Sequence, residues 1–174
     1  GGKYFRVIDY KTGHKDFDYT DLLCGKGLQM LLYLFSLWEN GARRYGREVL
    51  PAGVLYSGVK PPQVDLKIGG DVGGENVEIR TSGLFLKNEE ILRAMEPALE
   101  GVFIPVKAGD LAKEKSSLIG LDAFTELKRE VTQTVLRYAD ELRRGAACAR
   151  PLVVNGKSPC EYCKMRPVCR TGSK

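Results

Sequence analysis

The chain carries a carboxylate and an ammonium group two residues apart near its start, at Asp9 and Lys11. They lie among strand-forming residues, and we expect residues 4–11 to form a buried strand that ends at Thr12-Gly13. Side chains alternate along a strand, so both groups would point to one face, roughly 7 Å apart along the chain. A carboxylate can bind a hard divalent cation and an ammonium can orient an attacking water, which predicts a hydrolytic metal site. The alternative is a solvated surface ion pair, because Asp-x-Lys alone is common.

A second polar pair, Gln29 and Tyr33, lies in the apolar run of residues 25–38. The run is apolar on nearly all sides, which predicts a buried helix, and it is shorter than the roughly 20 apolar residues that span a bilayer. A spacing of four residues puts both side chains on one helix face. A buried glutamine needs hydrogen-bond partners. Either a polar site on the neighbouring strand or a nearby backbone carbonyl would supply them.

Three of the five cysteines, Cys160, Cys163 and Cys169, have the spacing C-x2-C-x5-C. Thiolates two residues apart can hold one metal ion or one corner of a cluster. Zinc and a four-iron cluster each need a fourth ligand, and His14 is the single histidine of the chain. No secretory signal is apparent, which favours metal binding over a disulfide framework.

These groups must be positioned by an α/β arrangement of strands and helices. We expect further strands at residues 52–56, 102–106 and 152–154, a hairpin of residues 64–68 and 75–80, and helices at residues 88–95 and 122–144. Residues 14–23 and 108–120 are polar and are expected to be loops. We expect Asn88 and Asp122 to cap the two later helices, and Gly41 and Gly145 to end helices.

Length and composition set broad limits. The 174 residues suffice for one domain with a core, and 43% hydrophobic with 28% charged residues is typical of a globular protein. The net charge of +5 mildly favours a polyanionic partner such as nucleic acid. Arg43, Arg44 and Arg47 form a basic patch after the first helix, facing either DNA phosphates or only solvent. No transmembrane run is present, and we expect a cytoplasmic protein.

Asp9-x-Lys11 on a strand, followed by Gln29-x-x-x-Tyr33 on the next helix, resembles the nuclease domain of the RecB family within the PD-(D/E)xK superfamily. The resemblance implies a restriction-endonuclease-like core over residues 1–150, with a mixed sheet flanked by helices. It also implies DNA as substrate and Mg²⁺ or Mn²⁺ as cofactor. By this resemblance Asp9 binds the metal and Lys11 positions the attacking water. Gln29 and Tyr33 then orient the DNA phosphate or the active-site strand.

The cysteine spacing is similar to that which closes the iron–sulfur nucleases of this family. These include the B subunits of AddAB-type helicase–nucleases and the CRISPR-associated Cas4 proteins. The similarity implies that Cys160, Cys163 and Cys169 bind a structural 4Fe–4S cluster, in a segment of residues 151–174 that packs on the core. The fourth cysteine would lie upstream of this chain, because Cys24 and Cys148 do not match its position. Residues 82–86 and 90–96 favour the helicase–nuclease relatives, which implies an AddA-type partner subunit.

One departure from the family pattern concerns the first acidic metal ligand, which belongs on a strand before the Asp9 strand. Since the chain runs almost directly into that strand, we expect a piece of a larger protein whose core is incomplete on its N-terminal side. The expected parent is an exonuclease that processes double-strand breaks for recombination, and the isolated chain should show little or no cleavage. The alternatives are a Cas4-like nuclease or a non-catalytic DNA-binding scaffold, with zinc as an alternative to the cluster.

Overall fold

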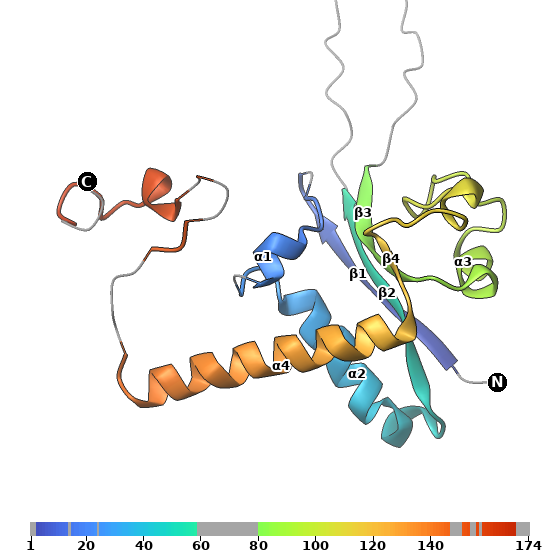
Figure 1. Ribbon diagram of the computed structural model, residues 1–174, viewed down its shortest axis with the longest axis horizontal. Helices are drawn as coiled ribbons and strands as arrows, with labels where there is room; N and C mark the ends of the chain where they lie inside the picture. Colours follow the sequence, from blue (N-terminus) through green and yellow to red (C-terminus); the bar gives the residue numbers. More distant parts are fainter. Residues whose placement is uncertain are drawn as a thin grey trace, which may run out of the picture. The chain divides into compact units, whose positions relative to one another are not determined.

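A computed structural model of the protein describes residues 3–13, 15–23, 25–58, 80–146, 151–153, 156 and 158–169 (Figure 1). The chain divides into two compact units. The first comprises Gly1–Phe17 and Gln29–Leu127, and the second comprises Asp18–Leu28 and Lys128–Lys174. The predicted hairpin of residues 64–68 and 75–80 lies almost entirely outside the described residues, as do His14, Cys24 and Cys148.

The first unit is built on a mixed sheet of four described strands, which confirms the predicted α/β class. The strands are β1 (Lys3–Lys11), β2 (Val49–Gly58), β3 (Thr81–Leu86) and β4 (Leu118–Ile119). Their order is β1-β2-β3-β4, and β1 is parallel to β2, β2 antiparallel to β3, and β3 parallel to β4. Strand β1 was predicted to be buried but is only half-buried, because it pairs with β2 alone among the described strands.

Helix α2 (Gln29–Tyr45) connects β1 to β2 and runs back along the sheet (Figure 1). It was predicted at residues 25–38, with Gly41 ending it. Gly41 is instead buried inside the helix, because a Cβ there would lie 2.9 Å from Val49 Cγ2 and only glycine allows this close approach. The helix ends before Gly46, which has a positive φ of 70°. It buries one face only, since Tyr33 is 54% exposed, whereas burial on all sides was expected.

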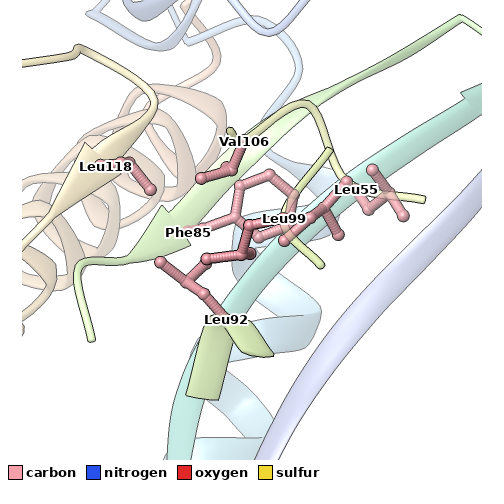
Figure 2. Close-up of a cluster of buried hydrophobic side chains, with 7 residues drawn as sticks. Leu55, Phe85, Leu92, Leu99, Val106 and Leu118 are labelled. Carbon is pink, nitrogen blue, oxygen red and sulfur yellow. The ribbon is translucent and has the colours of Figure 1, made fainter. Parts of the chain in front are cut away.

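An apolar cluster covers one face of the sheet. Figure 2 shows Leu55 and Phe85 from the sheet against Leu92 of α3 (Glu89–Met95), with Leu99 and Val106 from the loop that follows. The Phe85 ring lies over Gly53 and Gly83, where an added Cβ would approach ring atoms to 2.9 and 3.0 Å. The two glycines therefore make room for the largest side chain of this cluster.

Residues 82–86 belong to strand β3, which leads into helix α3 through Lys87 and Asn88. The helix itself is confirmed, and the Asn88 side chain accepts a hydrogen bond from the Ile91 amide as an N-cap. Residues 102–106 were predicted to be a strand and are not. The loop expected at residues 108–120 contains a 3₁₀ turn, Ala108–Asp110, as well as β4.

A buried carboxylate explains why residues 102–106 do not form a strand. Glu96 is only 3% exposed, and its two oxygens accept hydrogen bonds from four backbone amides at 2.9–3.0 Å. The donors are the amides of Glu100, Val102, Phe103 and Ile104. These amides turn inward to one side chain and are no longer available to a neighbouring strand.

The second unit contains α1 (Tyr19–Leu23), most of α4 (Leu121–Arg143) and a 3₁₀ turn at Pro159–Tyr162. Residues 14–23 were expected to be a loop throughout, so α1 corrects that prediction. Helix α4 begins one residue before Asp122, which is therefore not its cap, whereas Gly145 ends it with a φ of 70° as expected. The predicted strand at residues 152–154 is wrong for the two residues that are described.

Candidate active site

Asp9 and Lys11 lie at the end of β1 and form an ion pair, with Asp9 Oδ2 and Lys11 Nζ 2.6 Å apart. The prediction that both side chains point to one face is confirmed. About a third of each side chain is exposed, 28% for Asp9 and 34% for Lys11, so the pair is open to solvent. The hydrogen bond to Asp9 raises the pKa of Lys11 above 10.5, against an opposing effect of burial. Lys11 is therefore a charged ammonium at neutral pH.

Tyr56 of β2 extends the site across the sheet. In the strand register Asp9 pairs with Tyr56, and Tyr56 pairs with Ser82 of β3. Paired residues of adjacent strands point to the same face, so these three side chains form a row beside Lys11. The Tyr56 ring is buried, and Lys11 Nζ lies 5.9 Å from its centre. Sequence patterns do not report strand register, and Tyr56 was therefore not predicted as a site residue.

Helix α2 packs on the same face as this row. Lys3 pairs with Val49. The register of the two strands shifts between Phe5 and Arg6, but the extra residue, Ala52, is in β2, so alternation along β1 still puts Lys3 and Asp9 on the same face. The contact of Gly41 with Val49 therefore puts α2 over the Asp9 face. Since α2 runs back against the direction of β1 and β2, its N-terminal end lies toward the ends of the strands that carry Asp9 and Lys11 (Figure 1).

Gln29 and Tyr33 occupy that N-terminal end of α2. Gln29 Nε2 donates a hydrogen bond to the Tyr33 hydroxyl at 3.0 Å. The expected partner was a strand residue or a backbone carbonyl, and the difference follows from exposure, since both side chains are at the surface of the helix. Among the described residues, no hydrogen bond or ion pair joins this pair to Asp9 or Lys11. The structure thus assembles two polar pairs on one side of the sheet.

The basic patch of Arg43, Arg44 and Arg47 lies elsewhere. Arg43 and Arg44 belong to the last turn of α2 rather than to a connecting loop, and all three side chains are exposed. This end of α2 is next to the start of β2, whereas Asp9 and Lys11 lie at the other end of the strands. Eight residue steps along β1 correspond to about 26 Å. The patch is therefore not part of the immediate surroundings of the Asp9–Lys11 pair.

The three spaced cysteines lie in a short turn-rich segment of the second unit. The Cys163 amide donates to the Cys160 carbonyl at 3.3 Å, and the Cys169 amide donates to the Met165 carbonyl at 2.9 Å. None of the three cysteines is in a disulfide, and Cys163 is exposed whereas Cys160 and Cys169 are half-buried. No three His, Cys, Asp or Glu side chains converge on a metal-binding position in the part of the chain that the structure describes. The donors are thus of the right type but are not gathered.

The mixed sheet thus carries Asp-x-Lys at the end of β1, with α2 packed over the same face. The sequence profile of the PD-(D/E)XK nuclease superfamily matches residues 1–170, and the chain belongs to this superfamily.

No helix among the described residues is long and apolar enough to cross a membrane.

Three curated relatives are each named as the B subunit of an ATP-dependent helicase/deoxyribonuclease. The protein of Acetivibrio thermocellus is 32% identical over 97% of this chain, that of Clostridium perfringens 31% over 99%, and that of Ruminiclostridium cellulolyticum 30% over 97%. The matched region is 15–16% of the length of each relative. The chain therefore corresponds to a small part of much longer proteins.

Proposed function

We propose that this chain is the nuclease domain of a helicase–nuclease subunit and takes part in divalent-metal-dependent hydrolysis of DNA phosphodiester bonds. The observation that carries the proposal is the half-exposed Asp9–Lys11 pair at the end of β1, in a chain of the PD-(D/E)XK superfamily. Gln29 and Tyr33 lie on the same face and toward the same end of the sheet as this pair, which supports a shared role.

Asp9 fits the first requirement of a metal site, because its carboxylate is a hard oxygen donor with access to solvent. Mg²⁺ is commonly held by one or two carboxylates together with waters and substrate phosphates. Asp9 supplies one carboxylate, and we propose that the second belongs to the strand that precedes β1 in the family pattern, upstream of this chain. When bound, Mg²⁺ or Mn²⁺ would supply charge stabilisation at the phosphate and lower the pKa of a water.

The remaining roles belong to side chains of this domain. Lys11 is positively charged and fixed by Asp9, so it can hold the attacking water and stabilise negative charge that develops on the phosphate. Gln29 and Tyr33 are linked to each other and exposed, so they can donate hydrogen bonds to a phosphate of the substrate. Their mutual hydrogen bond fixes the direction of both side chains.

The wider role proposed for the parent protein is the processing of DNA double-strand breaks for recombination in the cytoplasm. The relatives are named as the B subunit of an ATP-dependent helicase/deoxyribonuclease, which supports a helicase–nuclease with a further subunit. The role in break processing, the AddA-type identity of that subunit and the cytoplasmic location rest on the family resemblance of the Asp9-x-Lys11, Gln29-x-x-x-Tyr33 and cysteine motifs. The name of the relatives favours this family over the Cas4-like alternative. We further propose that Cys160, Cys163 and Cys169 hold a structural 4Fe–4S cluster with a fourth cysteine from outside this chain. Closure of that site would require the three thiols to move together.

The experiment that tests the proposed activity is degradation of linear DNA by the full-length protein with its partner subunit, ATP and Mg²⁺. Asp9→Asn keeps the size of the side chain and removes the anionic donor, and it should abolish cleavage without loss of folding. Continued Mg²⁺-dependent cleavage by this variant would overturn the assignment of Asp9. The isolated chain should cleave weakly or not at all, because it supplies one carboxylate of the proposed pair.

A further inference from the structure

The segment after β1 returns over the face that carries Asp9. The Phe17 amide donates a hydrogen bond to the Ser82 hydroxyl at 2.8 Å, although the two residues are 65 positions apart. Ser82 pairs with Tyr56, and Tyr56 pairs with Asp9. This backbone contact therefore anchors the segment at the far end of the row that Asp9 begins.

Lys15 lies within this anchored segment, and its ammonium is held over the site. Lys15 Nζ is 4.8 Å from the centre of the Tyr56 ring, closer than Lys11 Nζ at 5.9 Å. The ring is buried and fixed in β2, with 5% of Tyr56 exposed. A cation–π contact holds an ammonium group through the ring face and leaves N–H donors for another partner.

Lys15 takes no part in the ion pair of the site. Asp9 is paired with Lys11, and no carboxylate of the described residues forms an ion pair with Lys15. The ammonium groups of Lys11 and Lys15 therefore both lie near the Tyr56 ring, and Asp16 and Asp18, which are close to Lys15 along the chain, are exposed. A cation whose position is fixed beside a hydrolytic site is suited to a phosphate oxygen.

We propose that Lys15 binds a backbone phosphate of the DNA substrate, with the Tyr56 ring as its support. This inference rests on the proposed nuclease function and adds a positioning contact that Asp9-x-Lys11 does not contain. In the competing explanation, Lys15 only fastens the segment to Tyr56 and contacts no substrate.

The test uses the full-length protein and its partner, as wild type and as Lys15→Ala, Lys15→Arg and Lys113→Ala. Lys113 is an exposed lysine of the same unit outside the site, and its variant is the matched control. DNA affinity is measured against salt concentration with Ca²⁺ in place of Mg²⁺, and cleavage is measured with Mg²⁺. Melting temperatures of all four proteins report any purely structural effect.

Loss of one phosphate contact should lower the slope of log affinity against log salt by about 0.7–0.9 in Lys15→Ala, for single or double strands respectively. KM for DNA should rise roughly tenfold, as expected for loss of one charge-assisted contact, with a smaller change in kcat. Lys15→Arg should keep the wild-type slope, and Lys113→Ala should match the wild type throughout.

An unchanged slope and KM in Lys15→Ala would overturn the inference, whether or not its melting temperature fell. If the wild type bound DNA without cutting it, the proposed function would fail while the salt slope still reported on Lys15. If the wild type cleaved DNA and Lys15→Ala had the same KM and the same salt slope, only the role of Lys15 would be refuted, and the proposed nuclease function would stand.

Discussion

Lys11 Nζ lies 2.6 Å from Asp9 Oδ2, so the ammonium and carboxylate groups of the site are already in contact before any substrate or metal binds. The pair is held by a single strand, in which alternation puts residues i and i+2 on one face. Lys11 is thereby fixed in direction and kept protonated, with Asp9 as its anchor. A cation bound at Asp9 would share that carboxylate with Lys11.

The Gln29–Tyr33 pair should affect DNA cleavage much more than folding. Both side chains are exposed, so Gln29→Ala and Tyr33→Phe should each change the free energy of unfolding by less than about 1 kcal/mol. Each variant should lower kcat/KM for linear DNA about tenfold or more if the pair contacts a phosphate. Urea unfolding and cleavage assays measure the two effects. Asn40→Ala, a polar change later on the same helix, is the control, and equal activity of all three variants would remove the pair from the site.

Loss of the buried Glu96 carboxylate should destabilise the domain. Glu96→Gln removes the negative charge and replaces one accepting oxygen by an NH2 donor, so it cannot accept the same four amide hydrogen bonds. We expect the free energy of unfolding to fall by about 2–4 kcal/mol at pH 7. Glu100→Gln changes an exposed residue of the same loop and should cost less than about 0.5 kcal/mol. Urea titrations followed by circular dichroism give both values. Equal stability of the two variants would contradict the anchoring role of Glu96.

The contribution of Glu96 should also depend on pH in a defined direction. Burial alone would raise the pKa of Glu96, but the four amide hydrogen bonds outweigh it and lower the pKa below 4.5. A carboxyl group with a depressed pKa stabilises the fold above its unfolded pKa, and this stability is lost as the pH falls through the folded pKa. The difference between wild type and Glu96→Gln should therefore be constant above about pH 5 and shrink below pH 4.5. A difference that grew on acidification would have the wrong sign.

Gly83 should tolerate no side chain. A Cβ at this position would collide with the Val54 carbonyl oxygen and approach the Phe85 ring to 3.0 Å. Gly83→Ala should therefore cost about 3 kcal/mol or more, because backbone in the centre of a sheet cannot move aside. Gly109→Ala is the control, since nothing lies within 4 Å of its added Cβ. Thermal unfolding of the two variants should differ clearly, and matching melting temperatures would contradict the packing around Phe85.

The segment with Cys160, Cys163 and Cys169 should determine the iron content and the stability of the protein, and should not take part in DNA hydrolysis. The full-length protein should contain about four irons with a brown colour, and Cys163→Ser should lose both. Cys148→Ser, at a cysteine outside the C-x2-C-x5-C spacing, should keep them. Melting temperature should fall with the cluster, while residual cleavage at low temperature should stay dependent on Mg²⁺. A colourless wild type with one zinc per chain would replace the cluster with a zinc site.

Local patterns predicted much of what is local in the structure. Strands β1 and β2, the Asn88 cap and the shared face of Asp9 and Lys11 follow from residue preferences and from the two-residue period of a strand. The spacing of Gln29 and Tyr33 likewise predicted that they share one helix face, although the hydrogen bond between them was not expected.

Features that depend on tertiary contacts were not predictable from these patterns. Gly41 has the sequence signature of a helix end, yet the helix continues because Val49 packs against it. Glu96 directly follows a predicted helix, and the sequence around it gives no sign that four backbone amides further along the chain donate hydrogen bonds to its carboxylate. Tyr56 and Lys15 join the site only through strand register and the Phe17–Ser82 contact, which join distant parts of the chain.

The most direct test is exonuclease activity on linear DNA with Mg²⁺, comparing the full-length protein with its Lys11→Ala variant in the presence of the partner subunit and ATP. Lys3→Ala, at the opposite end of the same strand, is the control. We expect the wild type and Lys3→Ala to cleave and Lys11→Ala to lose cleavage by at least about a hundredfold while remaining folded. Equal cleavage by Lys11→Ala would contradict the catalytic role of Lys11. No cleavage by any of the three proteins would contradict the nuclease assignment and favour a non-catalytic DNA-binding scaffold.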